Sequence, residues 1–336
     1  MPPVAAHGKA PRETAAAAVG GEASRSAKTE ERSEAKPADA ENITWSRAVR
    51  VNVYIAADKR IETVPLETYV RGVVAGEMPA DFEMEALKAQ AVAARTYIVR
   101  KMLLDAGQAE GGKRKADVTA EQDDQVYVPL DELASRWPKD GDAKLARIAR
   151  AVKETEGLIL TYGGEPIQAA FFSTSNGYTE NSEDYWSVAL PYLRSVPSPW
   201  DAQLSPRFKQ TIEMKLNDFY AKLGIKKKDR KGGIAALSRT EGRSIKSIRV
   251  GRKTFTGREA REKLGLPSAS FVWSVKGDTI AITCFGYGHG VGMSQWGAQA
   301  LAKAGNEAEQ ILAYYYRGAK VEPASKLPAV AEKFKT

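Results

Sequence analysis

Apolar and polar residues alternate along residues 49–55, where valine and isoleucine occupy every second position. A period of two predicts a half-buried strand. The spacing then becomes helical, because Pro65 precedes apolar residues that recur at helical intervals up to residue 74, and Gly76 is expected to close this helix. Asp81 is expected to cap a second helix that runs to about Leu104. Residues 76–80 are therefore predicted to be a short connection between two helices.

Further elements follow from the same reasoning. Residues 158–162 and 167–172 flank Gly163-Gly164 and predict a hairpin. Residues 279–285 predict a strand that runs into a glycine-rich loop. Helices are expected at 216–223, at 294–303 and at 307–316, the last opened by a capping box of Asn306 with Glu309. Strands and helices mix without a regular alternation, which indicates an α+β fold.

The two ends of the chain have a different composition from the middle. Residues 2–42 contain no Ile, Leu, Phe, Tyr or Trp, so they cannot bury enough apolar surface to offset their ordering entropy. We predict a disordered tether at 1–42, a single compact domain at 43–322 and a flexible tail at 323–336.

Composition excludes several classes of protein. The chain has one cysteine and two histidines, which excludes an intramolecular disulfide framework and almost excludes a Cys/His zinc site. We therefore expect no metal and no cofactor. No apolar run approaches 18 residues, so neither a transmembrane helix nor a signal peptide is expected within this sequence.

Positive charge is concentrated in one segment. Residues 226–263 contain 14 Lys and Arg against 4 Asp and Glu, whereas the whole chain has a net charge of +8. This segment is either a solvated basic face or a contact for a polyanion. A nucleic acid is the weakest candidate, because the segment has no recognised binding motif and its aromatic residues do not interleave with the basic ones.

Two cations fall on the apolar stripe of the helix predicted at 81–104. Arg95 and Lys88 lie within about 40° of the stripe's centre when the helix is projected at about 100° per residue. A buried arginine needs a partner. Arg95 is therefore either part of a structural pair with a carboxylate or a cation that lines a site.

Glu77 is the candidate acid in the predicted connection. Its neighbours are apolar, and burial raises the pKa of a carboxyl group. The negative end of the preceding helix acts in the same direction. A carboxyl group poised near neutral pH suits general acid catalysis, although most loop glutamates are merely solvated.

Two polar loops are candidate binding segments. The first is the glycine loop 286–297, in which alternate glycines let backbone approach a ligand; it contains Tyr287, His289, Ser294, Gln295 and Trp296. It matches neither a dinucleotide fingerprint nor a P-loop, and Ser294 also suits a plain N-cap. The second loop follows residue 172. It combines hydroxyl and amide groups with nearby aromatic rings, a combination that suits a sugar, in Ser173, Thr174, Ser175 and Asn176.

Three stretches, at residues 64–97, 172–181 and 286–298, together resemble the stage II sporulation protein D (SpoIID/LytB) family. The similarity extends over about residues 45–322. It implies a peptidoglycan lytic transglycosylase that cleaves between N-acetylmuramic acid and N-acetylglucosamine during engulfment of the forespore. The products would be 1,6-anhydro-muramic ends of denuded glycan.

The resemblance also implies roles for particular residues. The family's catalytic glutamate falls on Glu77, and its helical lysine and arginine fall on Lys88 and Arg95. Its Pro-Tyr-Leu-Lys segment reads Pro191–Arg194 here, so Tyr192 and Arg194 are expected to line the site, with arginine in place of lysine. Some relatives hold zinc just before a Gln-Val-Tyr segment, but residues 119–127 have neither Cys nor His.

Partners and location are implied in the same way. The resemblance implies denuded glycan strands, a cell-wall amidase and membrane proteins of the engulfment machinery as partners, at an extracytoplasmic, membrane-associated place in the mother cell. The family's usual membrane anchor is not present in this sequence. An alternative remains open, because some relatives enhance an amidase without cutting glycan, and Glu77 would then be dispensable.

Overall fold

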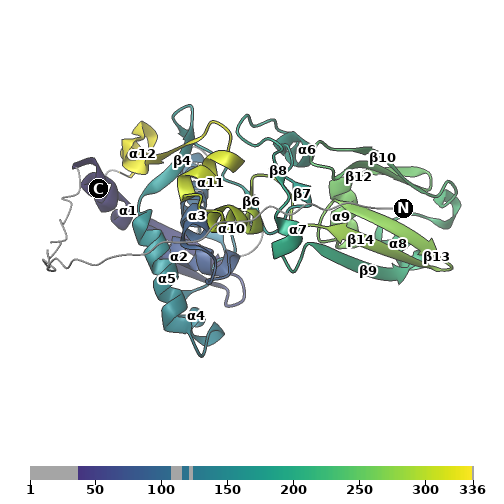
Figure 1. Ribbon diagram of the computed structural model, residues 1–336, viewed down its shortest axis with the longest axis horizontal. Helices are drawn as coiled ribbons and strands as arrows, with labels where there is room; N and C mark the ends of the chain where they lie inside the picture. Colours follow the sequence, from purple (N-terminus) through teal and green to yellow (C-terminus); the bar gives the residue numbers. More distant parts are fainter. Residues whose placement is uncertain (1–36, 107–115, 121–123, 335–336) are drawn as a thin grey trace, which may run out of the picture. The chain divides into compact units, whose positions relative to one another are not determined.

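The computed structural model describes residues 37–106, 116–120 and 124–334, which belong to one compact unit that spans 36–336 (Figure 1). Helices and several small sheets of two or three strands are mixed along the chain without a regular alternation. The predicted α+β fold class is confirmed. The buried apolar residues form two separate clusters, which we call the first core and the second core.

The first core surrounds helix α3 (Met84–Ala106), which contacts several helices and two strands. Every residue from 89 to 96 of α3 is buried, as expected for a helix that is covered on several sides. Five alanines in its first three turns allow close approach of its neighbours. The other helices that contribute buried side chains to the first core are α1 (Pro37–Ala48), α2 (Leu66–Glu77), α4 (Leu130–Arg136), α5 (Gly141–Glu154), α10 (Gln295–Lys303), α11 (Ala308–Tyr315) and α12 (Pro328–Lys333).

Small sheets complete this part of the molecule. The first joins β1 (Arg50–Ile55) to β2 (Arg60–Pro65) and, in parallel, to β3 (Val118–Thr119). The second places β4 (Leu158–Tyr162) between β5 (Glu165–Pro166) and β16 (Lys320–Pro323). A hairpin from β4 is confirmed, but the prediction of its second arm at 167–172 is wrong: the arm is β5, just before that range. Within 167–172, β6 (Phe171–Phe172) pairs instead in parallel with β15 (Met293–Ser294).

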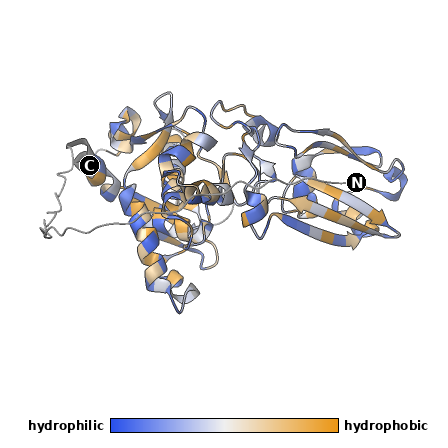
Figure 2. Ribbon diagram, in the orientation of Figure 1, coloured by the Kyte–Doolittle hydropathy of each residue, from blue (hydrophilic) through white to orange (hydrophobic). Residues whose placement is uncertain are grey.

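The second core contains the basic segment 226–263. It lies between two antiparallel sheets with helices α8 (Leu216–Lys222) and α9 (Gly257–Leu264). One sheet joins β10 (Ile234–Arg239), β11 (Ile245–Val250) and β12 (Lys253–Thr256), and the other joins β9 (Lys209–Lys215), β13 (Phe271–Lys276) and β14 (Thr279–Phe285). Hydrophobic and hydrophilic residues mix along these strands in Figure 2. In β11, Ile245 and Ile248 are buried while Lys246 and Arg249 are exposed, so most of the basic charge lies on solvated faces of a packed element.

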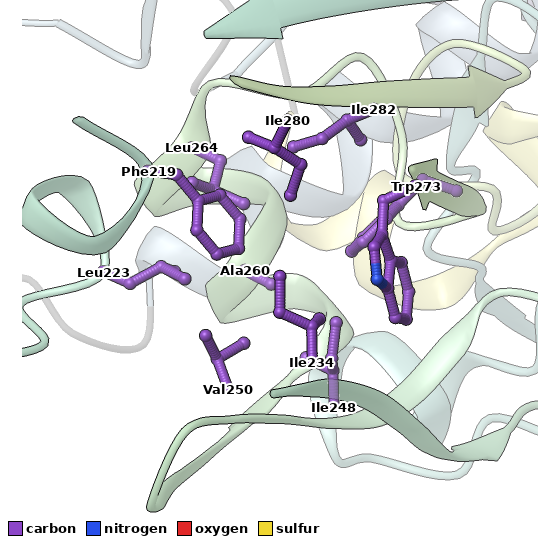
Figure 3. Close-up of a pocket in the computed structure, with 11 residues that line it drawn as sticks. Phe219, Leu223, Ile234, Ile248, Val250, Ala260, Leu264, Trp273, Ile280 and Ile282 are labelled. Carbon is purple, nitrogen blue, oxygen red and sulfur yellow. The ribbon is translucent and has the colours of Figure 1, made fainter. Parts of the chain in front are cut away.

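A small cavity lies inside the second core (Figure 3). Its lining is entirely apolar and includes Phe219, Val250, Leu264 and Trp273. It offers no polar group to fix a ligand, which a binding site requires. The cavity is therefore a gap in core packing.

Both predicted chain ends need correction where the structure describes them. The predicted tether 1–42 lies mostly outside the described residues, but 37–42 begin helix α1, which Trp45 anchors in the first core. The predicted tail 323–336 contains helix α12 (Pro328–Lys333), and Leu327 and Val330 are buried. The predictions of disorder followed the polar composition of these ends, and the few apolar residues that anchor them were not given enough weight.

Candidate functional site

Glu77 is the last residue of α2, not part of the connection, because α2 continues through Gly76 and has Met78 as its C-cap. The connection is 78–83, and α3 begins at Met84, so Asp81 is not its N-cap. The backbone carbonyl of Glu83 accepts the first helical hydrogen bonds of α3. Glu77 thus stands at the negative end of a helix that the first core holds firmly.

Two N–H groups hold the Glu77 carboxyl. Its Oε1 accepts a hydrogen bond from the backbone N–H of Val126 at 2.9 Å, and its Oε2 accepts one from Nε2 of Gln295 at 3.3 Å. Among the described residues, no cation and no second carboxylate is within bonding distance of it. The site therefore contains one carboxyl group with a fixed orientation.

The pKa of Glu77 is raised above its ordinary value. Burial is the largest cause, since it disfavours the charged form, and the hydrogen bonds from Val126 and Gln295 oppose it. The balance favours the protonated acid more than in a solvated glutamate. A side chain in this state can donate a proton to a substrate that reaches it.

Gly76 is required by the approach of the segment that carries Val126. A Cβ at residue 76 would lie 2.6 Å from the backbone oxygen of Val126 and 3.1 Å from its Cγ1. Any side chain would push this backbone away. Gly76 therefore allows the close approach that the hydrogen bond from Val126 to Glu77 requires. The prediction that Gly76 ends the helix is wrong.

Gln295 connects Glu77 to the core helix. Its Nε2 also lies 3.4 Å from Oε1 of Gln90, a fully buried residue of α3. Gln295 opens α10, which the Ser294 side chain caps by accepting the N–H of Gly297. The N-cap interpretation of Ser294 is confirmed. The sequence did not indicate Gln90 as a site residue, because a glutamine among the alanines of a helix forms no distinctive pattern.

A buried aspartate ties the two predicted loops together. Asp201, in the short helix α7 (Asp201–Leu204), accepts hydrogen bonds from the backbone N–H of Ser175 at 2.7 Å and from the Ser294 hydroxyl. Its other oxygen accepts from Ser198, which also bonds to the Tyr315 hydroxyl. Burial raises the pKa of Asp201, while these hydrogen bonds oppose the shift. Ser175 and Ser294 thus serve to join the loops, and only the contacts in the fold reveal Asp201.

The remaining loop residues also meet one another. Thr174 and Tyr287 exchange backbone hydrogen bonds at 3.0 and 2.8 Å, and the carbonyl of Ser173 accepts the N–H of Trp296. The Trp296 ring packs on Phe82 with 4.8 Å between ring centroids. Phe82 lies in the connection 78–83, which directly follows Glu77. The Trp296–Phe82 contact and the hydrogen bond from Gln295 to Glu77 therefore place the glycine loop beside Glu77.

Asn176 belongs to the loop that follows residue 172 and reaches the basic segment 226–263. Its Nδ2 donates to the carbonyl of Gly242 at 2.9 Å, and its Oδ1 accepts from the N–H of Tyr178, in β7 (Gly177–Tyr178). This asparagine therefore shapes the loop and links it to the basic segment.

Arg95 is a correction, because it does not line the site. Its side chain is fully buried and forms a two-pronged ion pair with Glu67, with Nη2–Oε2 at 2.6 Å and Nε–Oε1 at 2.9 Å. The backbone oxygens of Leu158 and Val152 accept further hydrogen bonds from it. Of the two alternatives that the sequence left open for Arg95, the structure shows the structural ion pair. The pair forms because Glu67, in the first turn of α2, reaches the core face of α3.

Lys88, Tyr192 and Arg194 also have partners of their own. Lys88 pairs with Glu85 at 2.9 Å and with Glu154 at 2.5 Å. Tyr192 is buried, and its hydroxyl accepts the N–H of Gln168. Arg194 forms an ion pair with Glu183. Contact with substrate stays a prediction for these three residues.

His289 lies among aromatic rings. Its ring centroid is 5.7 Å from Phe172, 5.6 Å from Tyr185 and 5.3 Å from Trp186. Its Nδ1 accepts the N–H of Val291 at 3.0 Å. Burial, aided by the charge of Arg261, lowers the pKa of His289 to about 4. At neutral pH this side chain is therefore an uncharged ring and not a cation.

Further tests of the described residues concern metals and membranes. No three His, Cys, Asp or Glu side chains among them gather as a metal site. The zinc-free interpretation of 119–127 stays a prediction, since 121–123 lie outside the described residues. None of the described helices has the length and apolar character needed to cross a bilayer.

Comparison with known proteins gives a consistent result. The family model described as "Stage II sporulation protein" (SpoIID) matches residues 55–162. "Stage II sporulation protein D" of Bacillus subtilis (strain 168) is 48% identical over 277 residues, which cover 82% of this chain and 80% of that protein. Its counterpart in Bacillus amyloliquefaciens is 47% identical over 278 residues, with 82% and 79% covered.

A more distant relative has a different name. The "Amidase enhancer" of Bacillus subtilis (strain 168) is 30% identical over 302 residues, which cover 74% of this chain but only 39% of that protein.

Proposed function

This chain belongs to the stage II sporulation protein D family, and we propose that it is a peptidoglycan lytic transglycosylase that uses Glu77 as its single acid and base. The observation that carries the proposal is the state of Glu77: one carboxyl group with a raised pKa, held by two N–H groups. A role in cell-wall processing during sporulation follows from the family.

The proposed reaction needs only one carboxyl group. Protonated Glu77 gives its proton to the glycosidic oxygen while the bond to C1 of N-acetylmuramic acid breaks. The resulting carboxylate takes the proton of that sugar's own 6-hydroxyl, and the oxygen bonds to C1 to form the 1,6-anhydro ring. Most glycosidases instead use two carboxyl groups. The backbone of Val126 and the amide of Gln295 hold Glu77 in place and stabilise its ionised form during the reaction.

Substrate and location follow from the same proposal. Denuded glycan strands are the proposed substrate, with cleavage outside the cytoplasm at the mother-cell membrane and in concert with a cell-wall amidase. The experiment is digestion of amidase-treated sacculi with product masses read by mass spectrometry. Anhydro-muramic ends are expected. Reducing ends, heavier by one water molecule, would instead mean hydrolysis.

An alternative function has its own support. A relative named "Amidase enhancer" is similar over 74% of this chain, so the chain could act by stimulating an amidase. Glu77→Gln separates the two functions. Stimulation of an amidase that survives this substitution, with no anhydro products from the wild-type chain, supports the enhancer.

A further inference from the structure

Arg261, in helix α9, is a half-buried cation that faces the aromatic residues of α6 (Ser182–Trp186). Its Nη1 donates to the Tyr185 hydroxyl at 2.9 Å, and its Nε donates to the Leu266 carbonyl at 3.3 Å. Within the part of the chain that the structure describes, no carboxylate lies within ion-pair distance of its guanidinium. Its charge is thus left without an anionic partner.

The nearby acids already have other partners: Glu259 accepts hydrogen bonds from Thr256 in the capping box of α9, and the others pair with cations. On α6 and α9 these pairs are Glu183 with Arg194, Asp184 with Lys246 at 2.8 Å, and Glu262 with Arg258 at 2.8 Å. A shift of any of the acids in these pairs toward Arg261 would leave another cation unpaired. The surroundings therefore favour an anion that comes from outside the chain.

Aromatic rings stand next to this cation. Tyr185 contacts Trp186 edge to face at 5.8 Å, and both contact His289. Arg258 covers one face of Tyr185 at 4.8 Å. Trp186 and His289 are partly exposed, and the uncharged imidazole presents a flat surface at neutral pH. Such rings suit the apolar face of a sugar ring.

We propose that Arg261 and the rings of Tyr185, Trp186 and His289 form a subsite that binds a sugar bearing a carboxylate. The identity of this sugar rests on the function proposed above. Bare N-acetylmuramic acid carries a free lactyl carboxylate, whereas a stem peptide converts that group to an amide. Arg261 thereby distinguishes denuded glycan from peptide-bearing glycan.

The proposed subsite and the Glu77 site are close along the chain, as expected if one glycan strand contacts both. His289 and Gln295, which contacts Glu77, are six residues apart in the glycine loop. Even fully extended, this separation is at most about 21 Å. A short stretch of glycan can span such a distance, so one strand can occupy both the subsite and the Glu77 site.

The test is a binding measurement in a Glu77→Gln background, so that no glycan is cut. Two probes are compared by calorimetry: a GlcNAc–MurNAc tetrasaccharide with free lactyl carboxylates, and the same tetrasaccharide with those groups converted to amides. We expect about tenfold preference for the free carboxylates, the scale of one charge-assisted hydrogen bond. Arg261→Gln should abolish the preference, and Arg261→Lys should reduce it, because lysine lacks the planar fork.

Lys263→Gln is the matched control, because Lys263 is an exposed cation on the same helix and its loss changes the net charge equally. It should keep the preference. Since the preference is a ratio within one protein, partial unfolding cancels. Equal binding of both probes by the parent, or an unchanged preference in Arg261→Gln, would overturn the subsite. A retained preference with no cleavage by the wild type would refute only the lytic activity.

Discussion

The two ends of helix α2 each carry a glutamate, but they hold it in opposite ways. At the first turn, Glu67 meets the fully buried Arg95 in a two-pronged ion pair, and the helix dipole favours its charge. At the last turn, Glu77 meets two N–H groups and, within the described ranges, no cation; burial together with the negative helix end opposes its charge. One helix thus has a structural end and an end to which the proposed function assigns the chemistry, called the chemical end below.

This difference shows why residue type alone does not identify a catalytic acid. A carboxylate that pairs with a buried arginine fastens two helices together. A carboxyl group without a cation keeps its proton more readily. The absence of Arg95 from the surroundings of Glu77 therefore favours acid chemistry there, because a neighbouring guanidinium would lower the pKa.

The largest expected effect is the loss of cleavage in Glu77→Gln. The amide keeps the shape of the side chain but can neither give nor take the proton. Because general acid and base catalysis contributes about 10²- to 10⁴-fold, turnover should fall on that scale. The measurement is the rate of anhydro-product release from denuded sacculi, with binding to the same sacculi as the control. A rate within threefold of the wild type would, on the same scale, refute the role of Glu77.

The next effect concerns the structural end of α2. Arg95→Met leaves Glu67 partly buried without its cation and should lower the free energy of unfolding by about 3–5 kcal/mol. The double variant Glu67→Leu/Arg95→Met should recover much of this loss, since an apolar pair has no uncompensated charge. Urea titrations of the single and double variants test this. A double variant as unstable as the single one would contradict the ion-pair account.

A smaller effect is expected at Gly76. Alanine within a helix normally stabilises by about 0.5–1 kcal/mol, but here its Cβ meets the Val126 backbone oxygen. We expect Gly76→Ala to destabilise by about 1–3 kcal/mol, as overpacking does, and to lower turnover. Thermal unfolding and product release measure the two effects. An increase in stability would show that the segment at Val126 does not pack tightly against α2.

The subtlest effect is a shift in pH dependence. The Gln295 amide stabilises ionised Glu77, so Gln295→Leu removes a contact that lowers the pKa. The pKa of Glu77 should rise, the acid should stay protonated to higher pH, and the alkaline decline in activity should move upward. Gln299→Leu is the control, since Gln299 lies one turn later in α10 and accepts the N–H of Glu83. A downward shift, or equal shifts in both variants, would contradict this role of Gln295.

Local patterns in the sequence predicted the elements near the site well. The strand at 279–285 and the helix capped by Ser294 are confirmed, because alternation and capping are local signals. The helix predicted at 307–316 is α11, and it has a capping box, but Glu307 and Gln310 form it instead of Asn306 and Glu309. A shift of one residue cannot be read from composition, since several neighbouring polar side chains can cap.

Long-range pairing could not be predicted in the same way. The helical projection placed Arg95 on the apolar stripe correctly, yet both a structural and a functional partner fitted that position. Its actual partner, Glu67, lies 28 residues away. The contacts of Asp201 with Ser175 and Ser294 join three separate segments. Only the tertiary fold decides such pairings, because each polar group has several possible partners along the chain.

One measurement tests the comparison of the two ends of α2 most directly. It is the release of anhydro products per folded molecule by Glu67→Gln and by Glu77→Gln, with the amount of folded protein matched by circular dichroism. The account predicts that Glu67→Gln, although less stable, turns over at nearly the wild-type rate per folded molecule. Glu77→Gln should fold normally and lose at least about a hundredfold. Equal losses in the two variants would contradict the division between a structural end and a chemical end.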